Sequence, residues 1–288
     1  MYEIVRKEKL NPTITLLEVK APFIAKKAQA GQFIILRVDE YGERIPLTIA
    51  DFDNEKGTVT IVFQELGYST KLLGTLNAGD QILDFVGPLG IPTHFGDAKN
   101  VCVIGGGVGC AIAYPQAKTL YQNGATVHSI MGFRTKDLVF FEEEMKQVTH
   151  KLYICTDDGS YQEKGLVTDM LKRLIEEGNH YDLVIAIGPV LMMKYVSLLT
   201  KQYNIKTIVS LNPIMIDGTG MCGGCRVLVN NETKFACVDG PDFDGHLVDF
   251  DDLSMRLQSY RLQEKEANTH ECRLLGGKQQ LTKRYKKL

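Results

Sequence analysis

Three cysteines and an aspartate near the end of the chain have the spacing of a metal site. They read D-x4-C-x2-C-x11-C, at Asp217, Cys222, Cys225 and Cys237. The plant-type [2Fe–2S] pattern is C-x4-C-x2-C with a distant fourth cysteine, so a carboxylate takes the first place here. The x4 step and the dense glycines favour an iron–sulfur cluster over zinc, which Cys-x2-Cys pairs also bind. For the aspartate alone, an Asp-Gly turn is the alternative.

A second group of residues is typical of a phosphate-binding loop. Gly105, Gly106, Gly107, Val108 and Gly109 follow the apolar run VCVI and precede a helical pattern. Glycines let the backbone approach a pyrophosphate, and N–H groups at a helix start bind its charge. The motif G-x-G-x-x-G is met only in part, so a tight strand-to-helix turn without a ligand is the alternative.

Two further loops strengthen the prediction of a nucleotide site. They follow two other apolar runs and contain Asp157, Asp158, Gly159, Gly188, Pro189 and Met192. Open α/β sheets bind ligands at the carboxyl ends of their strands, where the three loops would meet. Arg134 and Lys136 follow another strand and could accept a 2′-phosphate, so these residues leave NADH and NADPH both open.

A third candidate site lies in the N-terminal part of the chain. Arg44 and Thr48 stand in RIPLTIAD, and Gly67, Ser69 and Thr70 stand in QELGYSTKLL. A cation, hydroxyls and a glycine-led helix start are donors that a phosphate group needs. A solvated strand face is the alternative, because an isolated arginine is usually exposed.

The elements that must position these residues change character twice along the chain. Alternating segments at 14–22, 31–39, 45–53, 57–65 and 79–87 predict strands, and 71–76 predicts a short helix. Five or six such strands predict a closed or half-closed antiparallel barrel. From about residue 99, buried-strand patterns alternate with helical patterns at 110–124, 137–148, 166–178 and 191–203. This alternation predicts a doubly wound parallel sheet.

The last part, from about residue 211, is rich in Gly and Asp and has too little apolar content for a large core of its own. Such a segment needs a cross-link, such as a bound metal centre, to be stable. An exposed helix is predicted at 250–267. The predicted organisation is therefore a barrel over 1–97, an α/β domain over 98–210, and a cluster segment with a tail over 211–288.

Composition and charge exclude several classes of protein. The 288 residues are 44% hydrophobic and 24% charged, as in a globular protein. A net charge of −2 gives no reason to expect a nucleic acid or an anionic membrane as partner. No apolar run approaches the ~18 residues of a membrane span. Seven cysteines without an export signal predict thiols or metal ligands in a reducing cytoplasm.

The order of these parts resembles the ferredoxin reductase-like superfamily over the whole chain. Within it, the chain is similar to the electron-transfer subunit of dihydroorotate dehydrogenase B. It is more similar to the small subunit of NADH-dependent reduced ferredoxin:NADP⁺ oxidoreductase, also known as sulfide dehydrogenase subunit beta. Like that small subunit, it has Asp217 before MCGGC and continues beyond Cys237 into GPDFDGHLVDFDDLSMR.

The resemblance implies FAD in the barrel, NAD(H) on the sheet and a [2Fe–2S] cluster on Asp217 and the three cysteines. The flavin motif R-x-[YI]-[ST] falls on residues 45–48, where Ile45 takes the arginine place and Arg44 stands one residue early. The implied FAD residues are Arg44, Pro46, Leu47, Thr48, Val62, Phe63, Gln64, Gly67, Ser69 and Thr70. The implied nucleotide residues are those of the three loops and Arg134.

The resemblance also implies an activity. NAD(H) exchanges a hydride with FAD, and the cluster passes single electrons to a larger flavin and [4Fe–4S] subunit. NADPH and ferredoxin react at that partner, in an electron-bifurcating complex. Two alternatives stay open: the electron-transfer subunit of a dihydroorotate dehydrogenase or a hydrogenase, and a zinc-stapled nucleotide-binding module without enzymatic activity.

Overall fold

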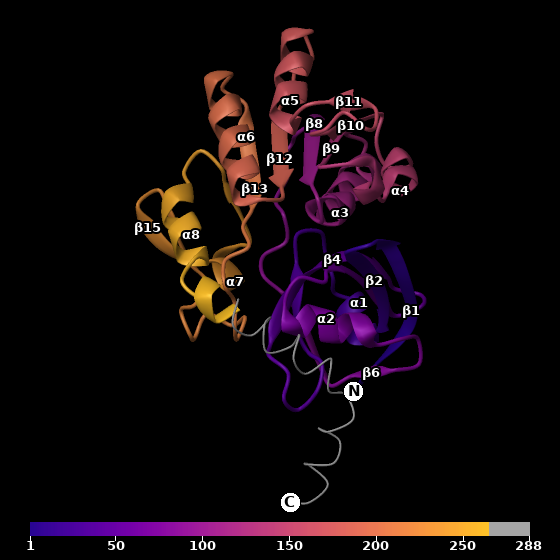
Figure 1. Ribbon diagram of the computed structural model, residues 1–288. Coiled ribbons are helices and arrows are strands. Elements are labelled where there is room, and N and C mark those ends of the chain that lie inside the picture. The colour runs from indigo at the N-terminus through magenta and orange to yellow at the C-terminus, as the bar shows by residue number, and fades with distance from the viewer. Residues whose placement is uncertain (265–288) are drawn as a thin grey trace, which may run out of the picture.

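The computed structural model describes residues 1–264, which form a barrel, a helix-covered sheet and a C-terminal segment. Figure 1 shows the barrel below the sheet, and the C-terminal segment running from the sheet down toward the barrel. The helix predicted at 250–267 is shorter than expected, because α8 (Phe250–Leu257) ends at a turn over 258–260. Residues 265–267 of the predicted range lie outside the described part, as do Cys272 and the basic tail. Within the described residues, no helix is both long and apolar enough to cross a membrane.

The barrel is one antiparallel sheet in the order β6-β1-β2-β5-β4-β3-β7. Its strands are β1 (Tyr2–Asn11), β2 (Ile14–Lys20), β3 (Phe33–Arg37), β4 (Ile45–Asp53), β5 (Thr58–Gln64), β6 (Gln81–Ile82) and β7 (Asp84–Leu89). Two short helices join them, α1 (Pro22–Ala25) and α2 (Tyr68–Thr75). The edge strands β6 and β7 follow each other in the chain, so the sheet is nearly closed, as predicted.

Two features of the barrel differ from the sequence prediction. The first strand, β1, was not predicted, because half of its residues are exposed and only two are buried, so its sequence shows no clear alternation. The predicted strand at 79–87 is two strands, since the chain turns at Leu83, whose N–H donates to the Val38 carbonyl. The barrel is filled by Ile4, Leu17, Ile34, Leu36, Ile61, Phe63 and Phe85.

The second sheet has the order β11-β10-β9-β8-β12-β13-β16. Its strands are β8 (Asn100–Gly106), β9 (Thr126–Phe133), β10 (Lys151–Thr156), β11 (Glu163–Lys164), β12 (Leu183–Ile187), β13 (Lys206–Ser210) and β16 (Asp242–Asp244). All pairings are parallel except that of β16. The chain runs outward from β8 to β10 and then returns to β12, so the strand order reverses beside β8. Ligands bind at such a switch point.

Helices cover both faces of this sheet, as predicted. They are α3 (Gly109–Gln122), α4 (Glu142–Lys146), α5 (Val167–Glu176) and α6 (Val190–Gln202). Small residues of α3 pack between the sheet and the barrel residues Ile14, Leu16, Ala50 and Val62. The helices α5, α6 and α8 pack on the other face. The barrel therefore meets the sheet across α3.

The helix predicted at 137–148 is interrupted. It consists of a 3-10 turn, η1 (Lys136–Leu138), and the short helix α4. Between them Phe140 and Phe141 are buried, and Phe141 has a φ of +60°. Burying two adjacent aromatic rings requires a turn here, and a left-handed residue ends any continuous helix.

The C-terminal segment adds one strand to the second sheet and forms a two-stranded sheet of its own. It contains the hairpin β14 (Arg226–Val229) and β15 (Glu232–Phe235), the helix α7 (Ala236–Asp239), and then β16 and α8. The strand β16 pairs antiparallel with β13, so the segment closes the edge of the nucleotide-type sheet. Its strands were not predicted, because they are only three or four residues long.

Candidate cofactor sites

A large cavity lies where the barrel meets the carboxyl edge of the parallel sheet. Its volume is about 1240 Å³, above the ~300–1,000 Å³ of a site for one small ligand. The barrel wall includes Ile14, Thr48 and Gln64, and the opposite wall is made by the loops that follow the parallel strands. The volume and the two walls fit two ligands that meet between the barrel and the sheet.

Three glycines at the end of β8 and the start of α3 are required mainly by packing. A Cβ atom on Gly106 would lie 2.5 Å from the Met192 sulfur, and one on Gly109 would lie 2.3 Å from the Ile187 carbonyl oxygen. A Cβ atom on Gly105 would be as crowded, against α3. Close packing of β8 and α3 against each other, against β12 and against the start of α6 therefore explains these three glycines, as the alternative of a tight turn predicts.

Gly107 is different, and it is the glycine that leaves room for a ligand. Its φ is +56°, and no atom lies within 4 Å of the place where a Cβ atom would stand. It lines the cavity together with Val108, immediately before the first turn of α3. Open space beside backbone N–H groups at a helix start fits a pyrophosphate.

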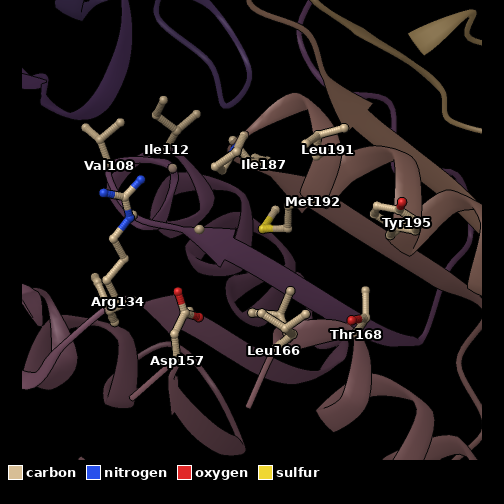
Figure 2. A pocket seen from close by; sticks show the side chains of 18 of the residues that line it. Val108, Ile112, Arg134, Asp157, Leu166, Thr168, Ile187, Leu191, Met192 and Tyr195 are labelled. Atoms are coloured by element: carbon tan, nitrogen blue, oxygen red, sulfur yellow. The ribbon is translucent and has the colours of Figure 1, made fainter. Parts of the chain in front are cut away.

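Arg134 and Asp157 line the outer end of the cavity (Figure 2). They follow the paired residues Phe133 and Thr156 of β9 and β10. The Asp158 N–H donates to the Arg134 carbonyl at 3.3 Å, which brings the two loops together. The cavity thus presents a guanidinium group and a carboxylate at the place where a nucleotide ribose is expected.

Asp158 and Gly159, also predicted as binding residues, do not line this cavity. The Asp158 carboxylate accepts hydrogen bonds from the Ser160 hydroxyl at 2.6 Å and from its N–H at 2.9 Å. These bonds lower the pKa of Asp158. Gly159 has a φ of +76°. Both residues form the turn that carries Asp157.

Other cavity residues were not predicted from the sequence. Ser210 is the last residue of β13, and Leu211 and Asn212 follow it. The carboxyl end of β13 is at the same edge as the three predicted loops. The sequence could have indicated these residues, because a fourth apolar run ends there. Leu166 and Tyr195 lie at the rim and are exposed, and nothing in their local pattern marked them. Gly188, Pro189 and Met192, which were predicted, line the centre.

Of the predicted FAD residues, the structure brings Thr48 and Gln64 to the cavity. Arg44 is exposed and makes no ion pair within residues 1–264. Pro46 and Leu47 are half-buried in β4. The side chains of Val62 and Phe63 are buried in the core, so only their backbone could reach a ligand.

The start of α2 holds the remaining predicted FAD residues, outside this cavity. The Gly67 N–H donates to Thr70 Oγ1 at 3.1 Å, and the Ser69 hydroxyl donates to Glu43 at 3.0 Å. Both hydroxyls are therefore engaged within the protein. Backbone N–H groups at the helix start stay the candidate phosphate donors, and the assignment of Gly67, Ser69 and Thr70 stays a prediction.

The four predicted cluster ligands form two pairs. Cys222 Sγ lies 3.3 Å from Asp217 Oδ1, and Cys225 Sγ lies 3.2 Å from Cys237 Sγ. In the part of the chain that the structure describes, no three His, Cys, Asp or Glu side chains surround one point as a single metal ion requires. A tetrahedral zinc site is therefore not preformed there. Two ligand pairs fit a binuclear cluster, whose two irons take two protein ligands each.

The two pairs differ in environment. Cys225 and Cys237 are buried against Phe33 and Ile35 of the barrel strand β3, whereas Cys222 is exposed. Burial, with the Cys225 thiol beside it, raises the pKa of Cys237 to about 12. A metal binds thiolate and releases that proton. One half of the proposed cluster would face the barrel and the other half the surface.

Asp217 has the contacts expected of a turn and of a ligand. Its carboxylate accepts hydrogen bonds from the N–H groups of Thr219, Met221 and Cys222. Partial burial raises its pKa, but these bonds outweigh that effect and lower it to about 2. The carboxylate is thus ionised and directed at Cys222 Sγ. Its role as a ligand stays a prediction.

Comparison with known proteins agrees with this architecture. Residues 212–249 match the family described as the iron-sulfur cluster binding domain of dihydroorotate dehydrogenase B. The chain is 46% identical to the dihydroorotate dehydrogenase B electron transfer subunit homolog of Thermotoga maritima, over 92% of this chain and 93% of that protein. It is 34% identical to the electron transfer subunit of Shouchella clausii, over 79% and 89% of the two chains.

A solved structure is similar over almost the whole length. A chain of the NADH-dependent reduced ferredoxin-NADP oxidoreductase, described for its insights into flavin-based electron bifurcation, has a TM-score of 0.90 and 43% identity. The match covers 94% of this chain and 98% of that chain.

Fold and sites together define a ferredoxin reductase-like oxidoreductase with an iron–sulfur segment. The chain belongs to the family of dihydroorotate dehydrogenase B electron-transfer subunits and their homologues. The predicted family, fold class and electron-transfer function are confirmed. So is the cofactor set of FAD, NAD(H) and an iron–sulfur cluster. The residues that hold each cofactor stay predictions.

Proposed function

We propose that this chain is the NADH-facing subunit of an electron-bifurcating ferredoxin–NADP oxidoreductase. Its partner is a larger subunit with a flavin and [4Fe–4S] clusters, where NADPH and ferredoxin react. The observation that carries the proposal is the 43% identity, at a TM-score of 0.90, to a chain of such an oxidoreductase. Asp217 in the first ligand position supports it, and six described cysteines that are free thiols fit a reducing cytoplasm.

The bound flavin accepts electrons in pairs from a nicotinamide and gives them up singly to an iron–sulfur cluster. The chain's own residues bind and orient the groups. The N–H groups around Gly107 at the start of α3 hold the nucleotide pyrophosphate. Thr48 and Gln64 lie on the barrel wall, where they would contact a bound flavin. The apolar side chains of Ile14, Ile112 and Met192 line the space between the walls and exclude water.

The barrel and sheet are fixed against each other by polar contacts. Lys118 of α3 donates to Asp51 of β4 at 2.8 Å, and both side chains are about one-third exposed. The Asn11 amide donates to the Leu138 carbonyl at 3.0 Å. A partly exposed ion pair contributes about 0–1 kcal/mol. Its main effect is to define the distance between the two walls of the cavity, and so between the two ligands.

We assign NADH rather than NADPH to this cavity because of Asp157. A carboxylate at the end of the second or third strand can accept hydrogen bonds from ribose hydroxyls, and it repels a 2′-phosphate. Arg134 beside it would favour the phosphate, so the two side chains act in opposite directions. The strand pairing and the backbone hydrogen bond between the two loops bring both residues to the same side of the cavity, so the carboxylate acts against the guanidinium group there.

The proposal is tested on protein purified without oxygen. Iron and acid-labile sulfide are assayed, the visible spectrum is recorded, and the protein is titrated with NADH and then with NADPH. We expect flavin and [2Fe–2S] absorption that is bleached by NADH at lower concentration than by NADPH. Colourless protein containing zinc would overturn the redox function.

A second candidate is the electron-transfer subunit of a dihydroorotate dehydrogenase. The family match of residues 212–249 and the 34% identity to the Shouchella clausii subunit favour it. Purification of the native complex distinguishes the two. A partner with [4Fe–4S] clusters that reduces NADP⁺ supports the bifurcating enzyme, and a partner with FMN that oxidises dihydroorotate supports the second candidate.

A further inference from the structure

One carboxyl group joins the three parts of the chain. Asp242 is the first residue of β16, in the C-terminal segment. Its Oδ2 accepts hydrogen bonds from the Thr93 hydroxyl and, at 3.3 Å, from the Gln116 amide. Thr93 belongs to the connection between the barrel and the sheet, and Gln116 is fully buried in the middle of α3. The barrel, the sheet and the iron–sulfur segment therefore meet on one oxygen atom.

Asp242, Thr93 and Gln116 form the junction between the three parts of the chain, and backbone hydrogen bonds lie close to it. The Ile91 N–H donates to the Gly240 carbonyl at 2.6 Å, and the Leu211 N–H donates to the Pro241 carbonyl at 2.9 Å. The Thr93 N–H donates to the Ala30 carbonyl of the barrel at 3.0 Å. These bonds hold the chain directly after Cys237 against the barrel on one side and against the edge of the cavity on the other.

The junction is polar, buried and incompletely satisfied. Asp242 Oδ1 and Gln116 Oε1 are buried and have no hydrogen-bond partner among the described residues. Leaving a buried polar atom unpaired is destabilising. Burial raises the pKa of Asp242 to about 6, although contacts with Ser210, Thr93 and Gln116 oppose the rise. An apolar residue would avoid both costs but would leave the Thr93 hydroxyl and the Gln116 amide without this acceptor, so the carboxyl group and its two partners form one unit.

The junction lies between the two places where electrons are expected. Cys225 and Cys237 pack against Phe33 of β3, and Phe33 is paired across strands with Thr48, which lines the cavity. Asp242 follows Cys237 by five residues, and its cross-strand partner Ser210 also lines the cavity. A shift of β16 would therefore change the separation of the cysteines from the flavin wall.

We propose that Asp242 is a positioning residue for electron transfer: with Thr93 and Gln116 it fixes the iron–sulfur segment relative to the flavin wall of the barrel. The proposal rests on the proposed function, because it assumes a flavin at Thr48 and a cluster at Cys225 and Cys237. Electron tunnelling falls exponentially with distance, so a small displacement of the segment slows transfer to the cluster. The transfer from NADH to the flavin does not cross the junction.

The test is rapid mixing of the purified holoprotein with NADH, with flavin reduction followed by absorbance and cluster reduction by freeze-quench EPR. D242A and T93V each remove hydrogen bonds at the junction. We expect cluster reduction to slow by about tenfold in D242A and by less in T93V. Flavin reduction stays within about twofold of the wild type, because the cavity is unchanged. D242N keeps an accepting oxygen, so it restores the wild-type rate of cluster reduction.

The matched control is T149V. Thr149 is as buried as Thr93 and also donates its hydroxyl to a carbonyl group, but it lies in the sheet domain away from the junction. Equal slowing in T93V and T149V, or a wild-type rate in D242A, would overturn the proposal. If D242A is isolated without iron, the rates of cluster reduction in T93V and T149V decide whether the proposal holds. Failure of the wild type to bind iron or to oxidise NADH would instead refute the proposed function.

Discussion

Phe33 and Thr48 lie directly opposite each other on the barrel strands β3 and β4, and each belongs to a different candidate cofactor site. Thr48 lines the cavity, and Phe33 packs with Cys225 and Cys237. The flavin and cluster sites are therefore separated by one pair of neighbouring strands. This adjacency explains why the iron–sulfur segment, which has little core of its own, is folded onto the barrel instead of standing apart.

Replacing Phe33 tests the contribution of this contact. F33A removes a ring that is 2% exposed. We expect the free energy of unfolding to fall by about 3–5 kcal/mol, because the substitution leaves a cavity in the core shared by β3 and the cysteine loop. F33L, which keeps most of the volume, should lose less. Urea denaturation of both variants, with iron content as a second readout, measures the effect; equal stability of F33A and the wild type would show that this core does not hold the segment.

The two loop glycines Gly107 and Gly109 should respond differently to alanine. In G109A the new methyl group meets the Ile187 carbonyl at 2.3 Å. Overpacking of this kind costs about 1–3 kcal/mol, so thermal stability falls. In G107A the methyl group points into open space, and only the left-handed backbone conformation is strained, by about 1–2 kcal/mol. Because that space is where the phosphate is expected, G107A should lose NADH affinity, measured by titration of the flavin absorbance. Unchanged NADH binding in G107A would move the pyrophosphate away from this loop.

Nucleotide choice should depend on Asp157. D157N removes a negative charge from the cavity while Arg134 stays in place. Repulsion of a 2′-phosphate by a nearby carboxylate corresponds to roughly 1–2 kcal/mol, so the NADPH-to-NADH preference should rise by about tenfold in D157N. The control is D158N, because Asp158 forms the neighbouring turn and does not line the cavity. A similar change in both variants would indicate an effect of the turn instead of the charge.

Much of this architecture could be predicted from the sequence, and the failures have physical causes. The parallel sheet could be predicted from short continuous apolar runs, because its strands β8, β9, β10, β12 and β13 are largely buried. The strand β1 was missed because half of its residues are exposed. The strand β16 was missed because three residues are too few to show an alternation of apolar and polar side chains. The candidate ligands Asp217 and Cys222 were found from spacing alone. Asp242 could not be found, because its role depends on Thr93 and Gln116, which are 149 and 126 residues away in the chain.

The ligand role of Asp217 is tested by two substitutions with different expectations. D217A removes an oxygen that lies 3.3 Å from Cys222 Sγ. We expect iron content to fall and the spectrum to change, because one iron loses a ligand. D217C supplies a thiolate, a softer donor than a carboxylate, so it should keep the cluster and shift its EPR spectrum and potential. An unchanged spectrum and potential in D217A would leave Asp217 with only its turn contacts to Thr219 and Met221.

The buried carboxyl group of Asp242 should make stability depend on pH. Its pKa is raised to about 6 in the folded protein from an ordinary value of 3.8. Between these two values the folded state binds more protons than the unfolded state, so the free energy of unfolding falls as pH rises through this window and levels off above it. The loss is about 2 kcal/mol between pH 4 and 7, since one pKa unit corresponds to about 1.4 kcal/mol.

The variant D242N isolates this contribution, because asparagine does not titrate and the other ionisable groups are common to both proteins. The stability of the wild type relative to D242N should therefore be greatest at acidic pH and should decrease as pH rises toward 7. Urea denaturation at a series of pH values measures this difference. A difference that stays constant with pH would mean that Asp242 has an ordinary pKa in the folded protein. Burial of its carboxylate would then carry no free-energy cost, and Thr93 and Gln116 would bind a charged group at neutral pH.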